Sequence, residues 1–415
     1  MATTSSSYRW NALYLVSAVA MISMTLAAAL QPLFLRKVLG VSLNNAGTIN
    51  ANVEVVAELV ALLVIGSLGA LSDRIGRTPI LVGGFLVGAF GSALALFSIA
   101  IGTATGLSGV VIYYLARIVM SLGACAIWPQ IIILSGDFAD SENRARKMSN
   151  TASMTAFGSV LVFAVLMQTP RHIGVIPVVF FNALLGLIGA WLASRLLIDV
   201  VPKQQSALPS RRIIKDILIR EPRIRAAFIA ALFSRGNVAA TGLFYMLWTV
   251  YFADLVGKSQ EQAAAHAGLV IGLVGLLLMA TSIGWGVVVD FLGRLNAIRI
   301  GMAISGAGFL MMTLVVNPFD LFVYIPMSLI ALGQVGVLLA PDVIVIDHTP
   351  DHLRGAMMGA LNITGGIGLI FVLEVGGALF DTVGPYAPFA VIGVGNILVS
   401  MYTWWTAQIK TPPES

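Results

Sequence analysis

The chain has 415 residues, of which 58% are hydrophobic and 10% are charged. Because soluble domains carry about 25% charged residues, this composition excludes an ordinary soluble protein and predicts a surface that faces lipid. The net charge of +5 does not indicate nucleic-acid binding, because the basic residues of the chain concentrate in loops that we expect on one side of a membrane.

Twelve apolar runs are each long enough to cross a bilayer, which takes about 20 residues in a helix. They lie at 11–35, 49–72, 78–101, 109–136, 147–168, 172–197, 225–253, 262–288, 296–317, 320–346, 355–380 and 385–408. The sequence therefore predicts an all-α membrane protein with twelve transmembrane helices in two pseudo-symmetric six-helix bundles. We expect these bundles at 1–197 and 225–415, joined by a cytoplasmic linker at 198–224.

The distribution of positive charge predicts the orientation of the chain. Most of the 24 Lys and Arg residues fall in the two tails and in the loops that follow the even-numbered runs. Short cytoplasmic loops carry an excess of Lys and Arg in membrane proteins. We therefore expect the bacterial-type inner membrane as the location, with both termini in the cytoplasm.

A short motif occurs twice, after the second and after the eighth apolar run. The residues that recur 217 positions apart are Gly69, Asp73, Gly76 and Arg77 in the first copy and Gly286, Asp290, Gly293 and Arg294 in the second. Two further pairs recur 210 positions apart, Asp137 with Arg144 and Asp347 with Arg354. A sustained internal match at nearly constant spacing indicates a duplicated chain.

The chemistry of the motif suggests a gate. An aspartate such as Asp73, placed after a helix, can accept hydrogen bonds from the unpaired N–H groups at the start of another helix. Gly69 and Gly76 would allow a close backbone approach and a tight turn. We predict that the residues of both copies, and the two Asp–Arg pairs, form the gate on the cytoplasmic side. A static loop with positive charges is the alternative.

These residues resemble a known family. The segment from Gly69 to Arg77 matches the G-x-L-x-D-R-x-G-R signature of the major facilitator superfamily. The resemblance covers nearly the whole chain and implies alternating access between two halves. It also implies that Asp73 faces the start of the eleventh helix near Gly355 and that Arg77 pairs with Asp137. By symmetry, Asp290 would face the start of the fifth helix and Arg294 would pair with Asp347.

Charged residues inside the apolar runs are candidates for binding and coupling. Glu54 and Glu58 are four positions apart, on one face of the second run. Arg117 in the fourth run lies at a depth comparable with Glu58. We predict a Glu58–Arg117 pair that couples transport to protons. A static salt bridge and the absence of contact are the alternatives, because Met120 and Ser121 replace the Gln and Gly of the family's R-x-x-Q-G signature.

The second half offers three further candidates, Arg235, Asp342 and Glu374. Arg235 and Asp342 are predicted to form one pair towards the cytoplasmic side. Glu374 and Glu54 lie at similar depths on helices that the family's fold brings together. Two adjacent carboxylates could share a proton or a cation. Alternatively, Glu54 faces the outer aqueous mouth.

The function predicted is secondary active transport of a small molecule or ion, coupled to protons. No nucleotide-binding loop appears, so ATP does not drive transport directly. No catalytic motif appears, and we expect no enzyme activity, no cofactor, no metal centre and a monomer in the bilayer. The segment from Asn50 to Gly76 also resembles facilitator proteins of magnetosome membranes, which would imply transport of iron or another metal cation. A non-transporting sensor or scaffold is the second alternative.

Overall fold

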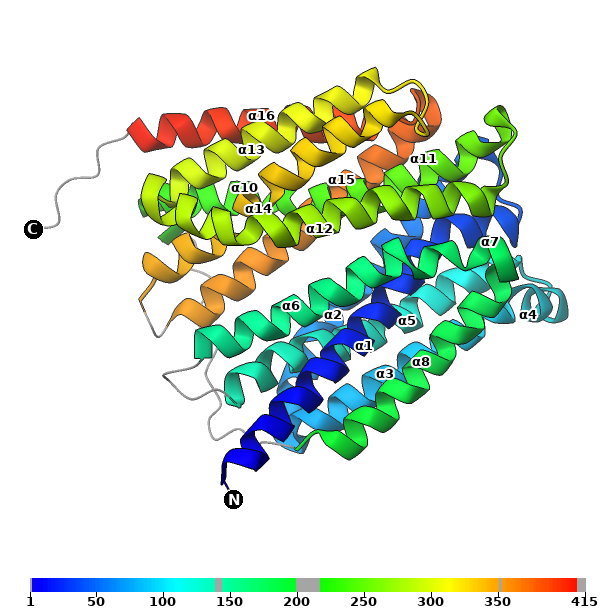
Figure 1. The fold of residues 1–415 in the computed structure, drawn as a ribbon, viewed down its shortest axis with the longest axis horizontal. Helices are drawn as coiled ribbons and strands as arrows, with labels where there is room; N and C mark the ends of the chain where they lie inside the picture. Colours follow the sequence, from blue (N-terminus) through cyan, green and yellow to red (C-terminus); the bar gives the residue numbers. More distant parts are fainter. Residues whose placement is uncertain (1, 139–143, 199–216, 351–352, 409–415) are drawn as a thin grey trace, which may run out of the picture. The chain divides into compact units, whose positions relative to one another are not determined.

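The computed structural model describes residues 2–138, 144–198, 217–350 and 353–408, and these are almost entirely helical (Figure 1). Twelve helical segments of this part are long and apolar enough to cross a membrane. They match the twelve predicted runs, so the predicted fold class is confirmed. The chain is an integral membrane protein.

The first half contains six spanning helices. They are α1 (Ala2–Lys37), α2 (Ala46–Ile75), α3 (Arg77–Leu96), α5 (Gly109–Asp137), α6 (Arg144–Ala164) and α8 (Val175–Leu196). Short helices lie between them: η1 (Leu43–Asn45), α4 (Ser98–Thr105), η2 (Leu166–Gln168) and α7 (Pro170–Ile173).

The second half repeats this order. Its seventh span is built from α10 (Pro222–Ala239), the π-helical turn η3 (Ala240–Phe244), α11 (Tyr245–Phe252) and η4 (Ala253–Val256). The remaining helices are α12 (Gln260–Leu292), α13 (Arg294–Met311), η5 (Met312–Leu314), η6 (Leu321–Val323), α14 (Tyr324–Asp347), α15 (Arg354–Thr382) and α16 (Ala387–Gln408).

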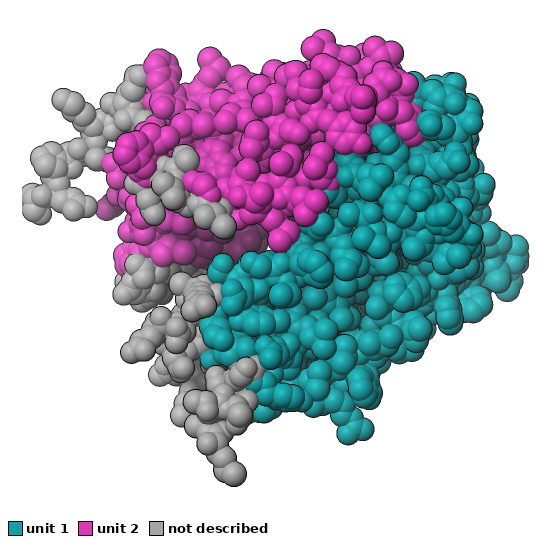
Figure 2. Space-filling view, in the orientation of Figure 1, with its two compact units in different colours: residues 1–43, 52–205, 249–272 teal, residues 44–51, 206–248, 273–415 magenta. Residues whose placement is uncertain are grey.

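The chain divides into two compact units, which Figure 2 colours separately. Unit 1 comprises residues 1–43, 52–205 and 249–272, and unit 2 comprises residues 44–51, 206–248 and 273–415. Each unit therefore includes a short segment from the other half of the sequence: the first turns of α2 belong to unit 2, and η4 with the first turns of α12 belongs to unit 1. Residues 199–216 of the expected linker lie outside the described part of the chain.

The same helix pairs pack in both halves. In unit 1, α1 packs on α6, and α3 packs on α5 and α8; in unit 2, α10 packs on α15, and α13 packs on α14 and α16. Close glycine crossings are also repeated. A Cβ on Gly84 would lie 2.8 Å from the carbonyl oxygen of Gly123, and a Cβ on Gly301 would lie 2.7 Å from that of Gly333. Only glycine permits such close helix contact, and these pairs keep the 217 and 210 spacings.

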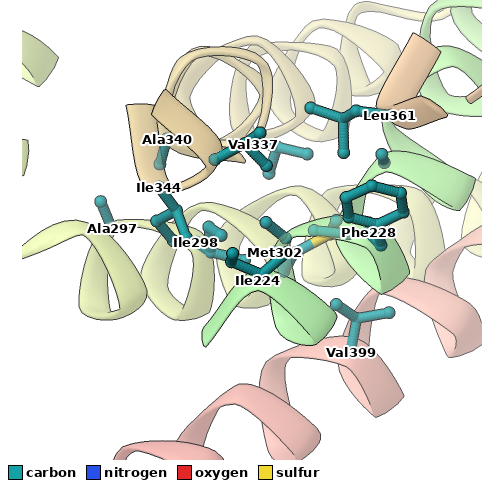
Figure 3. Packing of buried hydrophobic residues seen from close by; sticks show 14 of the residues in the cluster. Ile224, Phe228, Ala297, Ile298, Met302, Val337, Ala340, Ile344, Leu361 and Val399 are labelled. Atoms are coloured by element: carbon teal, nitrogen blue, oxygen red, sulfur yellow. The ribbon is translucent and has the colours of Figure 1, made fainter. Parts of the chain in front are cut away.

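Buried apolar side chains hold each unit together. In unit 2, Ile224 and Phe228 of α10 are four residues apart and therefore share one face of that helix. Figure 3 shows this face against Ile298 and Met302 of α13 and Val337 of α14. Such packing fixes the rotation of each helix about its axis, and with it the direction of its polar side chains.

Candidate functional site

A charged pair lies inside unit 1. Arg117 of α5 donates from Nη2 to Oε1 of Glu54 of α2. The side chain of Arg117 is 9% exposed and that of Glu54 is 25% exposed. Tyr113, one turn earlier on α5, is buried beside them. The pair gives each of these two ions the opposite charge that burial requires.

The prediction of a Glu58–Arg117 pair is wrong in its choice of carboxylate. The partner of Arg117 is Glu54, one helical turn earlier than the predicted Glu58. Because α2 begins at Ala46 and not at the predicted residue 49, Glu54 lies further from the start of the helix than the sequence suggested. The alternative in which Glu54 faces the outer aqueous mouth stays open, since its side chain is paired with Arg117 but remains 25% exposed. Glu58 is half-buried on the same helix.

Glu54 and Arg117 line a cavity of about 180 Å³ in unit 1. The other polar side chains in its wall come from four helices: Ser23, Ser92, Ser121 and Asn182. The remaining wall is apolar and includes Ala57 and Met120. This volume is large enough for several water molecules. The cavity therefore combines a cation, a carboxylate and neutral hydrogen-bonding groups inside a helix bundle.

Hydrogen bonds fix the neutral part of the cavity wall. Asn182 of α8 donates from Nδ2 to Oγ of Ser92 on α3 over 3.0 Å. Ser121 of α5 donates to the carbonyl oxygen of Ala57 on α2 over 3.0 Å. Oδ1 of Asn182 has no hydrogen-bond partner among the described residues. It is a buried acceptor on the cavity wall.

The charges predicted in the second half do not form the predicted pair. Asp342 of α14 is exposed and makes no ion pair within the described part of the chain. Arg235 of α10 runs along α15, where a Cβ on Gly365 would lie 2.9 Å from its Cδ. The stem of Arg235 therefore packs against Gly365 of α15. Glu374 is exposed on α15.

The predicted meeting of Glu54 and Glu374 remains a prediction. Glu54 belongs to unit 1 and Glu374 belongs to unit 2. The carboxylate of Glu54, which was predicted to share a proton or a cation with Glu374, is paired with Arg117.

The repeated motif forms a tight turn in both copies. Gly76 joins α2 to α3 with φ of 101°, and Gly293 joins α12 to α13 with φ of 83°. Both values lie in the region that only glycine adopts without strain. Arg77 is buried and donates from Nη1 to Oγ of Ser72 over 2.6 Å. Gly69 has no described atom within 4 Å of where a Cβ would lie, so it makes no close approach in this conformation.

The second copy contains the ion pair that symmetry predicted. Nε of Arg294 lies 2.6 Å from Oδ2 of Asp347 and ties the start of α13 to the end of α14. The side chains of Asp73, Asp137, Arg144, Asp290 and Arg354, and the surroundings of Gly286, lie outside the described part. Their contacts, and the gating role of the whole set, remain predictions.

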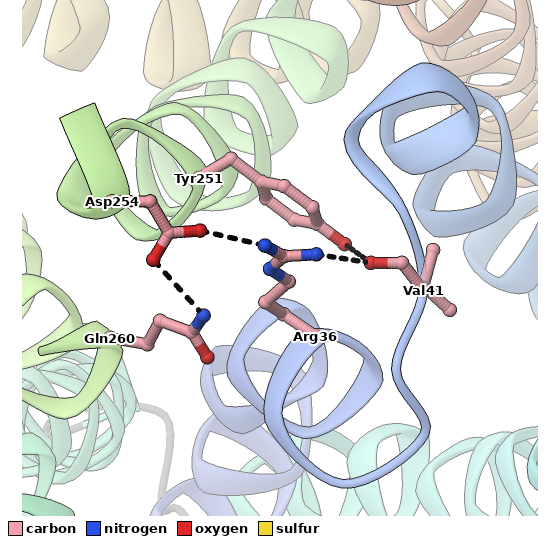
Figure 4. Close-up of polar contacts among 5 residues, drawn as sticks. All are labelled: Arg36, Val41, Tyr251, Asp254 and Gln260. Atoms are coloured by element: carbon pink, nitrogen blue, oxygen red, sulfur yellow. Dashed lines mark hydrogen bonds and ion pairs between the residues drawn. The ribbon is translucent and has the colours of Figure 1, made fainter.

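A polar cluster that sequence reasoning missed joins the end of α1 to the turn before α12. Arg36 donates to Asp254 over 2.6 Å and to the carbonyl oxygen of Val41 over 3.1 Å, and its guanidinium lies 5.1 Å from the centre of the Tyr251 ring (Figure 4). Lys37 lies 3.2 Å from Glu261 of α12.

The sequence did contain a signal for this cluster. Arg36 and Lys37 are basic residues at the end of the first run that the orientation places away from the cytoplasm. They oppose the general charge bias, and two acidic residues, Asp254 and Glu261, flank the loop at the same level. Across the described ranges, no group of three or more His, Cys, Asp or Glu side chains is arranged to hold a metal ion.

The fold has close counterparts among solved transporters. The nucleoside transporter NupG superposes with a TM-score of 0.75 at 14% identity, over 97% of this chain and 99% of that one. The POT family transporter PepTSo superposes with a TM-score of 0.71 at 15% identity, over 96% of this chain and 97% of that one. At these identities the likeness establishes the fold alone.

Sequence comparison gives closer relatives. Magnetosome protein MamH of Paramagnetospirillum magneticum is 48% identical over 392 residues, which are 94% of this chain and 91% of MamH. Magnetosome protein MamZ of Magnetospirillum gryphiswaldense is 34% identical over 401 residues, and the chain spans only 62% of MamZ. The family model of the Major Facilitator Superfamily matches residues 13–373 and again 236–415. This chain therefore belongs to the Major Facilitator Superfamily, a family of membrane transporters.

Proposed function

We propose that the chain is a secondary active transporter that moves a small solute by alternating access and couples this movement to protons at the Glu54–Arg117 pair. The observation that carries the proposal is a mostly buried ion pair in the wall of a polar cavity. Structural ion pairs are common, but this one borders space that a solute or water can enter.

The pair supplies a coupling chemistry. When Glu54 is ionised, it neutralises Arg117, and the cavity carries little net charge. When Glu54 takes up a proton, the guanidinium of Arg117 loses its counter-ion and can bind an anionic group of a solute. Guanidinium groups bind carboxylates and phosphates through paired N–H donors. Loss of the proton would restore the ion pair and release the solute.

The substrate class that fits this cavity is a small solute with an anionic group. Arg117 would bind that group, while Asn182 and Ser121 would contact its neutral part. The carboxylates Glu58, Glu374 and Asp342, with Arg235, are proposed to line the route of the solute or the proton. We also propose that Asp73, Arg77 and their repeated counterparts gate the cytoplasmic side, with both termini in the cytoplasm.

A second candidate is favoured by a specific observation. The chain is 48% identical to a magnetosome protein over 94% of its length. Under this proposal the protein resides in a magnetosome-type membrane and carries iron or another metal. Arg117 then favours an anionic complex of the metal with a small organic acid, because a bare cation would be repelled by the guanidinium.

The test is uptake into proteoliposomes that contain the purified chain. Radiolabelled ferric citrate, ferrous ion and a set of organic anions would be offered with and without an inward proton gradient. We expect gradient-dependent accumulation of an anion, with citrate-bound iron taken up and ferrous ion excluded. Accumulation that ignores the gradient would contradict proton coupling.

Two variants locate the coupling. Glu54→Gln should lose accumulation against the gradient but keep downhill exchange, because the solute-binding Arg117 remains. Glu221→Gln, at the start of α10 and outside the cavity, is the matched control and should keep both activities. Accumulation that survives Glu54→Gln would place the coupling elsewhere.

A further inference from the structure

Two equivalent contacts lie at the starts of α2 and α12. In unit 2, a Cβ on Gly377 of α15 would lie 2.6 Å from Cβ of Ala51 on α2. In unit 1, a Cβ on Gly268 of α12 would lie 2.7 Å from Cβ of Met167. Ala51 and Gly268 are 217 positions apart, and Met167 and Gly377 are 210 positions apart. The duplication therefore produced the same helix crossing twice.

The two helix starts differ in how their N–H groups are capped. The N–H groups of Gly47 and Thr48 on α2 donate to the two carboxylate oxygens of Asp381 on α15, over 2.6 and 2.8 Å. This cap comes from another helix. The N–H groups in the first turn of a helix have no partner inside the helix, so Asp381 supplies one for two of them.

The start of α12 is capped from within its own segment. The N–H of Ser259 donates to Oε1 of Gln262, and the N–H of Gln262 donates to Oγ of Ser259, both over 3.1 Å. This reciprocal arrangement is a capping box. Both partners lie at the start of α12, so this cap does not depend on the position of any other helix.

Alternating access would strain α2 at this point. Residues 44–51 belong to unit 2, whereas the rest of α2, including Glu54, belongs to unit 1. If the two units move relative to each other, the start of α2 must either stay on α15 or leave it. The cap from Asp381 exists only while the helix start rests on α15.

We infer that Asp381 is a positioning residue of the transport cycle, which holds the start of α2 on α15 in the state seen here and releases it when this end of the protein opens. The inference rests on the proposed transport function. A contact shifts a conformational equilibrium only if it differs between the two states. The Asp381 cap differs between them, and the Ser259–Gln262 box does not.

The strength of the contact supports this role. Hydrogen bonds to an ionised carboxylate are stronger than those between neutral groups, and a negative charge is favourable at a helix start. In the open state water would replace the carboxylate. Removal of Asp381 should therefore raise the population in which the α2 start has left α15.

The test measures that population directly. Nitroxide labels would be placed at Asn44→Cys and Val383→Cys, both exposed positions, in a full-length chain with Cys125→Ala. Double electron–electron resonance in lipid nanodiscs would give the distance distribution between the labels. In Asp381→Ala we expect the ratio of the long-distance to the short-distance population to rise about tenfold. Asp381→Asn, which keeps one acceptor oxygen, should give a smaller rise.

Gln262→Ala is the matched control, because it removes the equivalent cap at the start of α12. It should lower thermal stability without changing the ratio of the two populations. An unchanged distribution in Asp381→Ala, or in Asp381→Asn if the alanine variant does not fold, would overturn the inference. An equal shift in Gln262→Ala would also overturn it, since any damaged helix start would then have the same effect. A chain that shows the expected shift but transports nothing would refute the proposed function instead.

Discussion

The two halves of the chain share the contacts that pack their helices but differ in the charged residues between those helices. Asn182 donates to Ser92 over 3.0 Å between α8 and α3, and Asn396 donates to Ser305 over 3.2 Å between α16 and α13. The glycine crossings are repeated in the same way. Duplication has therefore preserved the contacts that set helix spacing in each half.

Among the described residues, the pair of Glu54 with Arg117 has no counterpart in the second half. At the positions that correspond to Glu54, Arg117 and Ser121, the second half has Ile271, Met327 and Ala331, all buried and apolar. Thus three polar positions of the first-half cavity correspond to apolar residues in the second half. The same helix packing therefore accommodates a charged pair in one half and apolar residues at the corresponding positions of the other.

The largest effect is expected from Arg117→Met. This change introduces into the first half the methionine that the second half has at the corresponding position, Met327. Glu54 would keep its charge without a partner, and breaking a buried pair from one side costs about 3–5 kcal/mol. Thermal unfolding in detergent measures this loss. The double variant with Glu54→Gln should recover most of the stability, because neither charge remains. A double variant less stable than Arg117→Met would contradict this interpretation.

A smaller difference is expected between the two motif arginines. Arg77 is buried and bonded to Ser72, whereas the Arg294 side chain is 44% exposed and pairs with Asp347. Arg77→Ala should therefore destabilise the protein by about 1–3 kcal/mol. Arg294→Ala should cost about 1 kcal/mol or less, because exposed ion pairs contribute little. Unfolding in detergent would compare the two, and equal losses would show that the copies are equivalent.

The features that the sequence predicted correctly depend on spacing along the chain. Gly76 was expected to allow a tight turn, and it and its repeat Gly293 both have positive φ. The Arg294–Asp347 pair followed from symmetry alone. Spacing of this kind survives into the structure because each repeat folds into the same helix pairs.

The features that the sequence missed depend on helix rotation and on depth to within one turn. Glu54 and Glu58 share a face, and their positions along the helix differ by only about 6 Å, little more than the about 4.5 Å by which α2 begins before its predicted start. Arg235 and Asp342 have comparable depths, but packing directs Arg235 towards Gly365 of α15. No pattern in a single sequence fixes such a direction.

Matched effects are expected where the halves agree. Asn182→Ala and Asn396→Ala each remove one buried side-chain hydrogen bond and leave a serine hydroxyl to find another partner. Each should cost about 1–2 kcal/mol. Unfolding of both variants in the same detergent would test the equivalence. If only Asn182→Ala lowers the stability, Asn182 stabilises the cavity of the first half and not the helix packing that both halves share.

The smallest effect on stability, but a clear effect on transport, is expected from Ala57→Val. The second half has Val274 at the corresponding position, and Ala57 lines the cavity of the first. The added methyl groups would enter existing space, so the change in stability should stay below about 1 kcal/mol. They would also reduce the volume open to a solute beside Arg117, so uptake into proteoliposomes should fall several-fold. Ala61→Val is the control: Ala61 is buried one turn further along α2 and is not part of the cavity wall. If both variants transport normally, the cavity beside the Glu54–Arg117 pair is not on the path of the solute, and the chemical difference between the halves would need another explanation.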